Sequence, residues 1–192
     1  MTRRALAPLA LPVLIACAPA PAREPGRAAP GRLDATPGMV LGGACTTSGP
    51  ERCFDARDDN CNGLIDDGCG LPTGYLQFAV AWAEEAADVE LEVTDPNGEL
   101  AEVGRATASG LVKQRDCPGE SRECHGQNLE NVYLEAGDPP RGRYSVRVRL
   151  ERLGGAEPPI RATIGARIGP KSHQAAVELT AEGASETLSL VL

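Results

Sequence analysis

Residues 143–150 read Arg-Tyr-Ser-Val-Arg-Val-Arg-Leu, and this stretch decides the fold class. Large apolar side chains occupy every second position from Tyr144 to Leu150, and polar side chains occupy the positions between them. A period of two residues is typical of a β-strand with one buried face and one solvated face. We therefore expect a strand here whose apolar face contributes to a core.

The same alternation recurs along the C-terminal part of the chain, in the runs 76–82, 89–93, 160–168, 177–179 and 188–192. Turn-forming residues separate these runs, at 95–98, 138–140, 154–155, 169–170 and 183. We find no convincing long helix. Short strands at this spacing predict an all-β fold, an antiparallel β-sandwich of about seven to nine strands over residues 75–192.

The N-terminus has the features of a secretory signal. Met1-Thr-Arg-Arg4 is a positive start, and an apolar run follows that ends at Ala16. This run is too short to cross a bilayer, which needs roughly 20 residues. We expect residues 1–16 to be a signal peptide and residues 17–44, rich in Ala, Pro, Gly and Arg, to be a flexible tether.

The sequence Leu14-Ile-Ala-Cys17 resembles the lipobox of bacterial lipoproteins. The resemblance implies cleavage before Cys17, diacylation of its sulfur and attachment to a membrane through the lipid. Ala18, which is not Asp, implies the outer membrane by similarity to known sorting rules. The alternative is an ordinary secretory signal that is cut near Ala20 or Ala22.

The formal net charge of -8 restricts the possible partners. An acidic chain is poorly suited to phosphate backbones, so we expect no nucleic-acid partner. It also has no electrostatic attraction to anionic lipid, so membrane contact depends on the lipid anchor.

Six cysteines remain after Cys17, and an even number in an exported chain indicates disulfides. They are Cys45, Cys53, Cys61, Cys69, Cys117 and Cys124. We expect Cys117 to pair with Cys124, with metal binding by these two thiols and His125 as the alternative. The other four allow three pairings, and their spacing does not choose among them.

The region 45–70 forms a cysteine-rich module with a loop that is typical of calcium sites. Oxygen ligands fall at loop positions 1, 3, 5, 7 and 9, as in an EF-hand; these are Asp58, Asn60, Asn62, the Leu64 carbonyl and Asp66. Position 12 is Cys69 where an EF-hand has Glu, so Asp67 or Asp55 would complete the shell. We expect one weakly bound structural calcium ion, and the alternative is that Asp, Asn and Gly only form turns.

Two resemblances bear on the modules. Residues 51–69, with Asp-Asn-Cys-Asn-Gly and Asp-Asp-Gly-Cys, resemble the MopE-type metal-binding repeat of bacterial cell-surface proteins and are similar to thrombospondin type 3 calcium repeats. Residues 75–168, through Asp88-Val-Glu-Leu-Glu-Val-Thr-Asp-Pro-Asn-Gly98, resemble the YfaP-type β-sandwich family, whose function is unassigned. That family usually has Asp-Leu-His where this chain has Glu90-Leu-Glu92, so we expect no site that depends on the histidine.

Catalytic signatures are missing from the sequence. There is no Gly-x-Ser-x-Gly, zinc-binding histidine pair or phosphate loop. Acids such as Asp88, Asp95 and Asp116 could form a carboxylate pair or a second calcium site, but turn caps and solvated edges are the simpler interpretation. We expect a non-catalytic binding or adhesion module for a protein or glycan, with a structural envelope or assembly protein, and then a secreted hydrolase, as alternatives.

Overall fold

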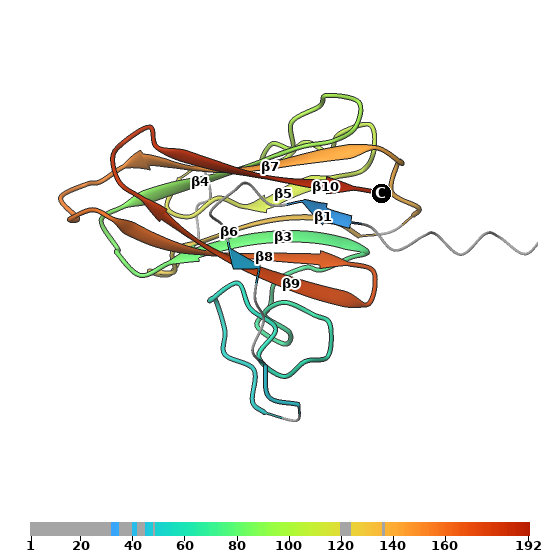
Figure 1. Cartoon of the computed structure of the whole chain (residues 1–192), viewed down its shortest axis with the longest axis horizontal. Helices are drawn as coiled ribbons and strands as arrows, with labels where there is room; N and C mark the ends of the chain where they lie inside the picture. Colours follow the sequence, from blue (N-terminus) through green and yellow to red (C-terminus); the bar gives the residue numbers. More distant parts are fainter. Residues whose placement is uncertain (1–31, 35–39, 42–44, 48, 120–123, 136) are drawn as a thin grey trace, which may run out of the picture.

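The computed structural model describes residues 32–34, 40–41, 45–47, 49–119, 124–135 and 137–192. The expected signal peptide and Cys17 lie outside these residues. The described part forms ten strands and no helix (Figure 1), so it holds no helix long and apolar enough to cross a membrane.

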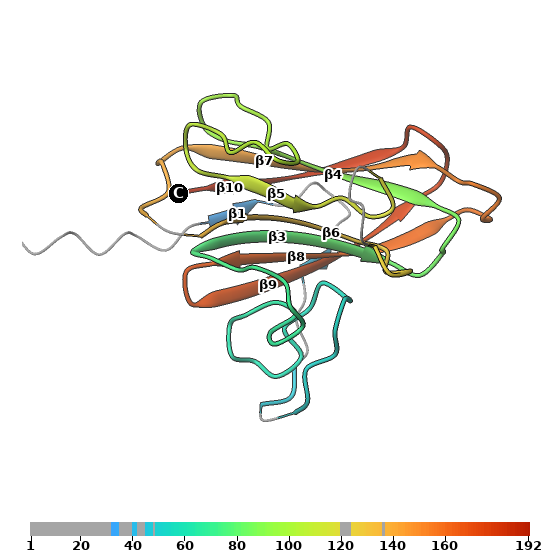
Figure 2. The same ribbon diagram turned by 180° about the vertical axis from the view of Figure 1, so that it is seen from behind.

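The strands form two antiparallel sheets that face each other (Figures 1 and 2). The four-stranded sheet has the order β1 (Arg32–Asp34), β10 (Ser185–Val191), β7 (Arg143–Arg152) and β4 (Asp88–Thr94). The six-stranded sheet has the order β2 (Val40–Leu41), β9 (Lys171–Leu179), β8 (Ile160–Ile168), β3 (Leu76–Trp82), β6 (Leu129–Leu134) and β5 (Val112–Arg115). The predicted all-β sandwich is thus confirmed, with eight of these strands in residues 75–192.

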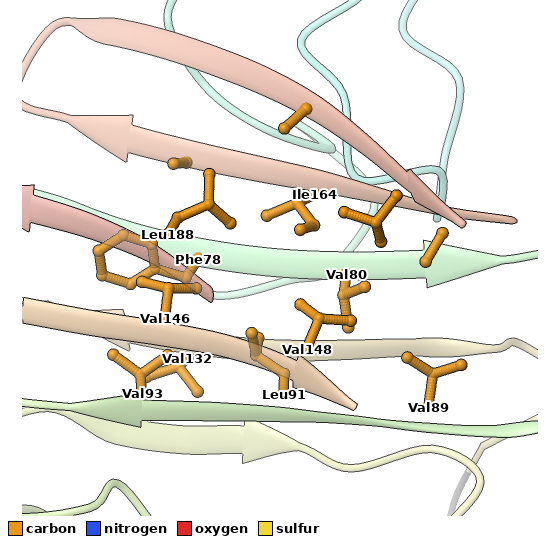
Figure 3. Packing of buried hydrophobic residues seen from close by; sticks show 14 of the residues in the cluster. Phe78, Val80, Val89, Leu91, Val93, Val132, Val146, Val148, Ile164 and Leu188 are labelled. Carbon is orange, nitrogen blue, oxygen red and sulfur yellow. The ribbon is translucent and has the colours of Figure 1, made fainter. Parts of the chain in front are cut away.

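The core lies between the sheets and is made by the predicted apolar faces. Val146 and Val148 of β7, Leu91 of β4 and Phe78 of β3 are buried and point into the same layer (Figure 3).

The opposite face of β7 is exposed to solvent. There the acids of β4 lie opposite the arginines of β7, with Glu92 beside Arg147 at 2.6 Å. Cross-strand pairs of opposite charge of this kind favour the observed register.

Two short parts of the expected tether pair with strands of the sandwich. Residues 32–34 pair with β10 and residues 40–41 pair with β9, so the tether supplies one edge strand to each sheet. Five residues of the expected tether therefore form strands. The physical reason is that an exposed strand edge offers unpaired N–H and C=O groups to any extended segment, whatever its apolar content.

Strand β3 is buried on both faces, which its alternation did not predict. Phe78 and Val80 face the inter-sheet core, while Ala79 and Ala81 face away from it. The cysteine-rich module lies against that second face, below β8 and β9 in Figure 1. The sheet therefore carries the module on its outer side, and this junction positions the candidate site.

Candidate functional site

Two interleaved disulfides frame the cysteine-rich module. Cys45 joins Cys61 and Cys53 joins Cys69, with the same sequence separation of 16 in both. Cys117 joins Cys124, as predicted. All six cysteines expected to be oxidised are paired, so Cys117 and Cys124 have no thiol to offer a metal.

Asp58, the first residue of the predicted calcium loop, is buried and organises the turn around it. Its carboxylate accepts backbone N–H groups from Asn62 at 3.0 Å and Gly63 at 2.9 Å. It also accepts the Ser172 hydroxyl at 2.5 Å, from β9 of the sandwich. The chain can turn there because Gly63 has a φ of 85°, and a side chain at that position would overlap the carbonyl of Pro170. Asp58 thus holds the loop in shape and ties it to the sheet.

The other loop positions present oxygens near the surface. Asn60 Oδ1 accepts the N–H of Asn62 at 3.0 Å, and Asn62 Oδ1 accepts the N–H of Leu64 at 2.8 Å. Asn62 Nδ2 donates to Asp67 at 2.9 Å, which brings Asp67 to the loop. Such side chain to backbone bonds are also what plain Asx turns make, so they fit both interpretations.

Asp66, the ninth loop position, is only 1% exposed and is directed to another part of the module. Its carboxylate accepts three backbone N–H groups: Phe54 at 2.5 Å, Asp55 at 3.1 Å and Ala56 at 3.1 Å. Phe54 and Ala56 have φ values of 68° and 59°, and this backbone forms a concave nest of N–H donors. Burial nevertheless raises the pKa of Asp66 to about 6, because the loss of solvation outweighs the hydrogen bonds that lower it.

The Asp55 side chain is directed neither to the loop oxygens nor to the N–H nest that binds Asp66. Its carboxylate accepts the N–H of Arg57 at 3.1 Å, and burial together with the negative charge of Asp59 raises its pKa. Among the described residues, the predicted acidic ligands do not bring three carboxylate oxygens within 4.8 Å of one another. The loop therefore offers mainly amide and carbonyl oxygens, with Asp58 and Asp67 as its carboxylates.

A small apolar interface holds the module on the sandwich. Ala56 and Ile65 pack against Ala79, Ala81 and Leu129 of the six-stranded sheet. The backbones approach closely. A Cβ at Gly165 of β8 would overlap the carbonyl oxygen of Ala56, so only glycine permits this contact. Small side chains on the sheet thus create the place where the module docks.

The segment between the two parts, residues 71–74, makes polar contacts with this face. Asn131 Nδ2 donates to the Pro72 carbonyl at 3.0 Å, and the Thr73 hydroxyl donates to Gln77 at 2.7 Å. Gln77 in turn donates to Asn131 at 3.1 Å. Both amide side chains are fully buried, and these bonds satisfy them.

A cleft of about 430 Å³ opens where the module meets the sandwich. We call it the arginine cleft, because three arginines line it together with acidic, aromatic and small residues. The lining residues are Arg52, Phe54, Asp55, Arg57, Asp59, Ala81, Trp82, Ala83, Arg161 and Thr163. Its size falls in the range of small-ligand sites, roughly 300–1,000 Å³.

The cationic groups of this cleft are exposed. Arg57 makes a long contact of 3.5 Å to Thr163, and Arg161 pairs with Glu178 at 3.0 Å. Both pairs are solvent-exposed, and an incoming anion competes easily with such pairs. Phe54 is held by Arg115, whose guanidinium lies 5.4 Å from the ring centre. The cleft therefore combines solvent-exposed cations with an aromatic ring that contacts Arg115.

A buried polar cluster at the far edge of the sandwich was missed by the sequence analysis. The acid–lysine cluster consists of Glu90, Lys113, Asp116 and Glu130, and its three carboxylates lie within 4.8 Å of one another. Lys113 Nζ contacts Glu90 and lies 2.9 Å from Glu130 Oε2 and 3.9 Å from Asp116. Of the acids considered from sequence, only Asp116 belongs to it. Asp88 pairs with Arg152, and Asp95 caps its own turn.

Comparisons of the chain with protein-family models, curated proteins and solved structures gave no match.

Proposed function

We propose that the chain is a lipid-anchored envelope protein that works as a non-catalytic, surface-displayed binding module. In this proposal the arginine cleft takes an anionic group of the ligand, on a protein or a glycan. The supporting observation is the concentration of Arg52, Arg57 and Arg161 in one cleft of a chain with net charge -8. Arginine suits this role because its planar guanidinium can form paired hydrogen bonds to a carboxylate, sulfate or phosphate.

The aromatic content of the cleft argues for a charged ligand over a neutral sugar. Trp82 is 7% exposed and gives its indole N–H to the Ala87 carbonyl at 3.0 Å, so it offers little surface. Phe54 is the one half-buried ring of the lining. Recognition of an anion by arginine needs no stacking platform, whereas neutral glycans usually do.

Binding by the full chain to a uronic-acid oligosaccharide, a carboxylate-rich peptide and a neutral oligosaccharide tests this proposal. A hydrogen bond to a charged group contributes about 1.5–3 kcal/mol, so Arg57→Ala should weaken anion binding at least tenfold. Arg143→Ala is the matched control, since Arg143 is an exposed arginine of β7 in the other sheet. Equal binding of the neutral probe, or anion binding unaffected by Arg57→Ala, would contradict the proposal.

The loop at residues 58–66 has, in this proposal, a structural role as a weak calcium site beside the cleft. The amide oxygens of Asn60 and Asn62 and the carbonyl of Leu64 are the neutral ligands, and Asp58 and Asp67 bring negative charge. Few charges and no bidentate Glu favour a Kd on the order of 10⁻⁴ to 10⁻³ M, the range of extracellular modules. Calcium at ten times Kd would stabilise the fold by about 1.4 kcal/mol.

Calorimetry and thermal melting of the full oxidised chain with calcium test the loop. The full chain is required because the module packs on the sandwich. Asp58→Ala should abolish calcium stabilisation, but it also removes structural hydrogen bonds, so Asn60→Ala is the sharper variant. Asp34→Ala in β1 is the control. The absence of heat and of a melting shift at about 10 mM calcium, ten times the top of the expected Kd range, would show that the Asp, Asn and Gly residues of the loop only form turns.

A further inference from the structure

The acid–lysine cluster closes one side of the sandwich. Lys113 lies on β5 and Glu130 on β6, at the edge of the six-stranded sheet, and Glu90 lies on β4, at the edge of the other sheet. Glu130 Oε2 accepts the N–H of Leu91 in β4 at 2.6 Å. This bond bridges the two sheets and covers a donor that would otherwise lie at an open strand edge.

The central groups of the cluster are removed from water. Glu130 is 0% exposed, Lys113 4% and Asp116 6%, and only Glu90 is partly open to solvent. Glu130 Oε1 has no N–H or O–H donor among the described residues, although Glu130 interacts with the carboxyl of Asp116. The geometry therefore places a buried carboxyl group beside a buried amine.

Burial and charged neighbours shift the pKa values of both Glu130 and Lys113. Burial raises the pKa of Glu130 well above its usual value, and the charges of Glu90 and Asp116 raise it further although Lys113 opposes them. Burial alone would lower the pKa of Lys113, but Glu130 and Glu90 outweigh it and raise that pKa. The raised pKa of Glu130 favours its neutral form, which is the form that reacts with an amine. The raised pKa of Lys113 favours the ammonium, whose proton must leave before Nζ can act as a nucleophile.

We propose that Lys113 and Glu130 form an intramolecular amide bond that joins β5 to β6. Lys113 Nζ is the nucleophile, the Glu130 Cδ carbon is the electrophile, and one water molecule is released. The reaction is a condensation between two side chains of this chain, so it needs no oxidant, reductant or further reactant. Groups held at contact distance react as if at very high concentration, with effective molarities of about 10⁵–10⁸ M in well-oriented cases.

The neighbouring side chains account for each proton. Glu90 contacts Nζ and takes one proton from the ammonium, which it can pass to solvent because it is partly exposed. The free amine attacks Cδ, and the N–H of Leu91 stabilises the negative charge on Oε2. Asp116 then moves a second proton from Nζ to the Oε1 hydroxyl, which departs as water. The third proton stays on the amide nitrogen.

The product removes two unfavourable features of the cluster. Oε1, the buried oxygen with no donor, is the atom that leaves, while Oε2 keeps its bond to Leu91 as the amide oxygen. The buried ammonium disappears as well, and its desolvation cost goes with it. A covalent link between β5 and β6 would then close the edge of the sheet next to the Cys117–Cys124 disulfide.

Peptide mapping of the purified full chain, after reduction and alkylation, tests the proposal directly. An amide at Lys113 blocks trypsin there, so peptide 106–115 should appear uncut and joined to peptide 123–141, lighter by one water than their sum. Lys113→Arg should abolish this species, because a guanidinium does not form the amide. Recovery of separate, unmodified peptides 106–113 and 123–141 from the wild-type chain would overturn the proposal.

Variants of the cluster test the roles proposed for Asp116 and Glu130. Asp116→Ala should greatly reduce the joined peptide, whereas Asp34→Ala should leave it unchanged, because β1 lies at the opposite edge of the four-stranded sheet from β4. A joined peptide that persists at the wild-type level in Asp116→Ala would refute the role of Asp116. A link from Lys113 to peptide 58–105, which contains Glu90, would overturn Glu130 as the electrophile. The wild-type mapping stands even where a variant folds poorly.

Discussion

Replacing Asp66 by asparagine should have little effect on stability at acid pH and should stabilise the protein at neutral pH. The carboxylate accepts N–H groups from Phe54, Asp55 and Ala56. Asparagine keeps one oxygen acceptor and turns an NH₂ group toward these donors, just as the protonated carboxyl turns its O–H group toward them. Near pH 4, where the wild-type side chain is largely neutral, we therefore expect similar free energies of unfolding for the two proteins.

The two proteins should diverge as the pH rises, because the wild-type carboxylate is poorly solvated. Its pKa is about 6 in the folded chain and 3.8 in the reference state, so between these values the folded state binds the extra proton. Stability from this group is therefore present at low pH and is lost as the pH rises through about 6. At about 1.4 kcal/mol per pKa unit, the wild type loses at most about 3 kcal/mol over this window, and Asp66→Asn does not.

Urea unfolding of both proteins at several pH values between about 4 and 8 measures the effect. Other buried acids, such as Glu51 and Glu130, also have raised pKa values, so the difference between the two proteins is the quantity to plot. A difference in the free energy of unfolding that grows in favour of Asp66→Asn between about pH 4 and pH 8 supports the reasoning. A difference that is constant, or that moves in favour of the wild type, would show that the N–H nest and not burial controls Asp66.

Three further predictions concern the module, the Cys117–Cys124 disulfide and the anchor. Ile65→Ala, at a side chain that is 1% exposed, should lower the free energy of unfolding by about 2–5 kcal/mol in urea, whereas Leu100→Ala at an exposed site should change it by less than about 0.5 kcal/mol. Joint replacement of Cys117 and Cys124 by serine should cost roughly 2.5 kcal/mol in thermal melting, and an unchanged melt would show that the ring adds nothing. Cys17→Ala should abolish partitioning into detergent, and wild-type partitioning would exclude lipidation at that residue.

The sandwich could be predicted because its strands β4, β7 and β8 each have one polar face. Strand β3 was harder, since its second face carries Gln77, Ala79 and Ala81, which could equally have met water. What decides their burial is the row of small residues that continues onto Gly165 of the neighbouring β8. Nothing in a single strand reveals such a row, because it appears only after the strand order is known.

The disulfide pattern of the module illustrates a different limit. The observed pairs are separated by 16 residues each, Cys45 with Cys61 and Cys53 with Cys69. Pairing consecutive cysteines would have given two equal, shorter loops, which is just as regular. The hydrogen bonds of Asp66 favour the observed pairs. Its carboxylate accepts the N–H groups next to Cys53, and this contact brings Cys69 close to Cys53.

The acid–lysine cluster was beyond sequence reasoning for a topological cause. In the alternation of β4, Glu90 belongs to the solvated face, and β5 is too short for its buried Lys113 to stand out from a turn. These residues meet only because β4 and β5 each lie at the end of a sheet and the two ends face each other. The bond from Leu91 to Glu130 satisfies an edge donor there, and it also requires a carboxyl group inside the sandwich. Protection of the edge and the proximity of Lys113 to Glu130 therefore have the same origin, which is why the proposed amide would form at this edge.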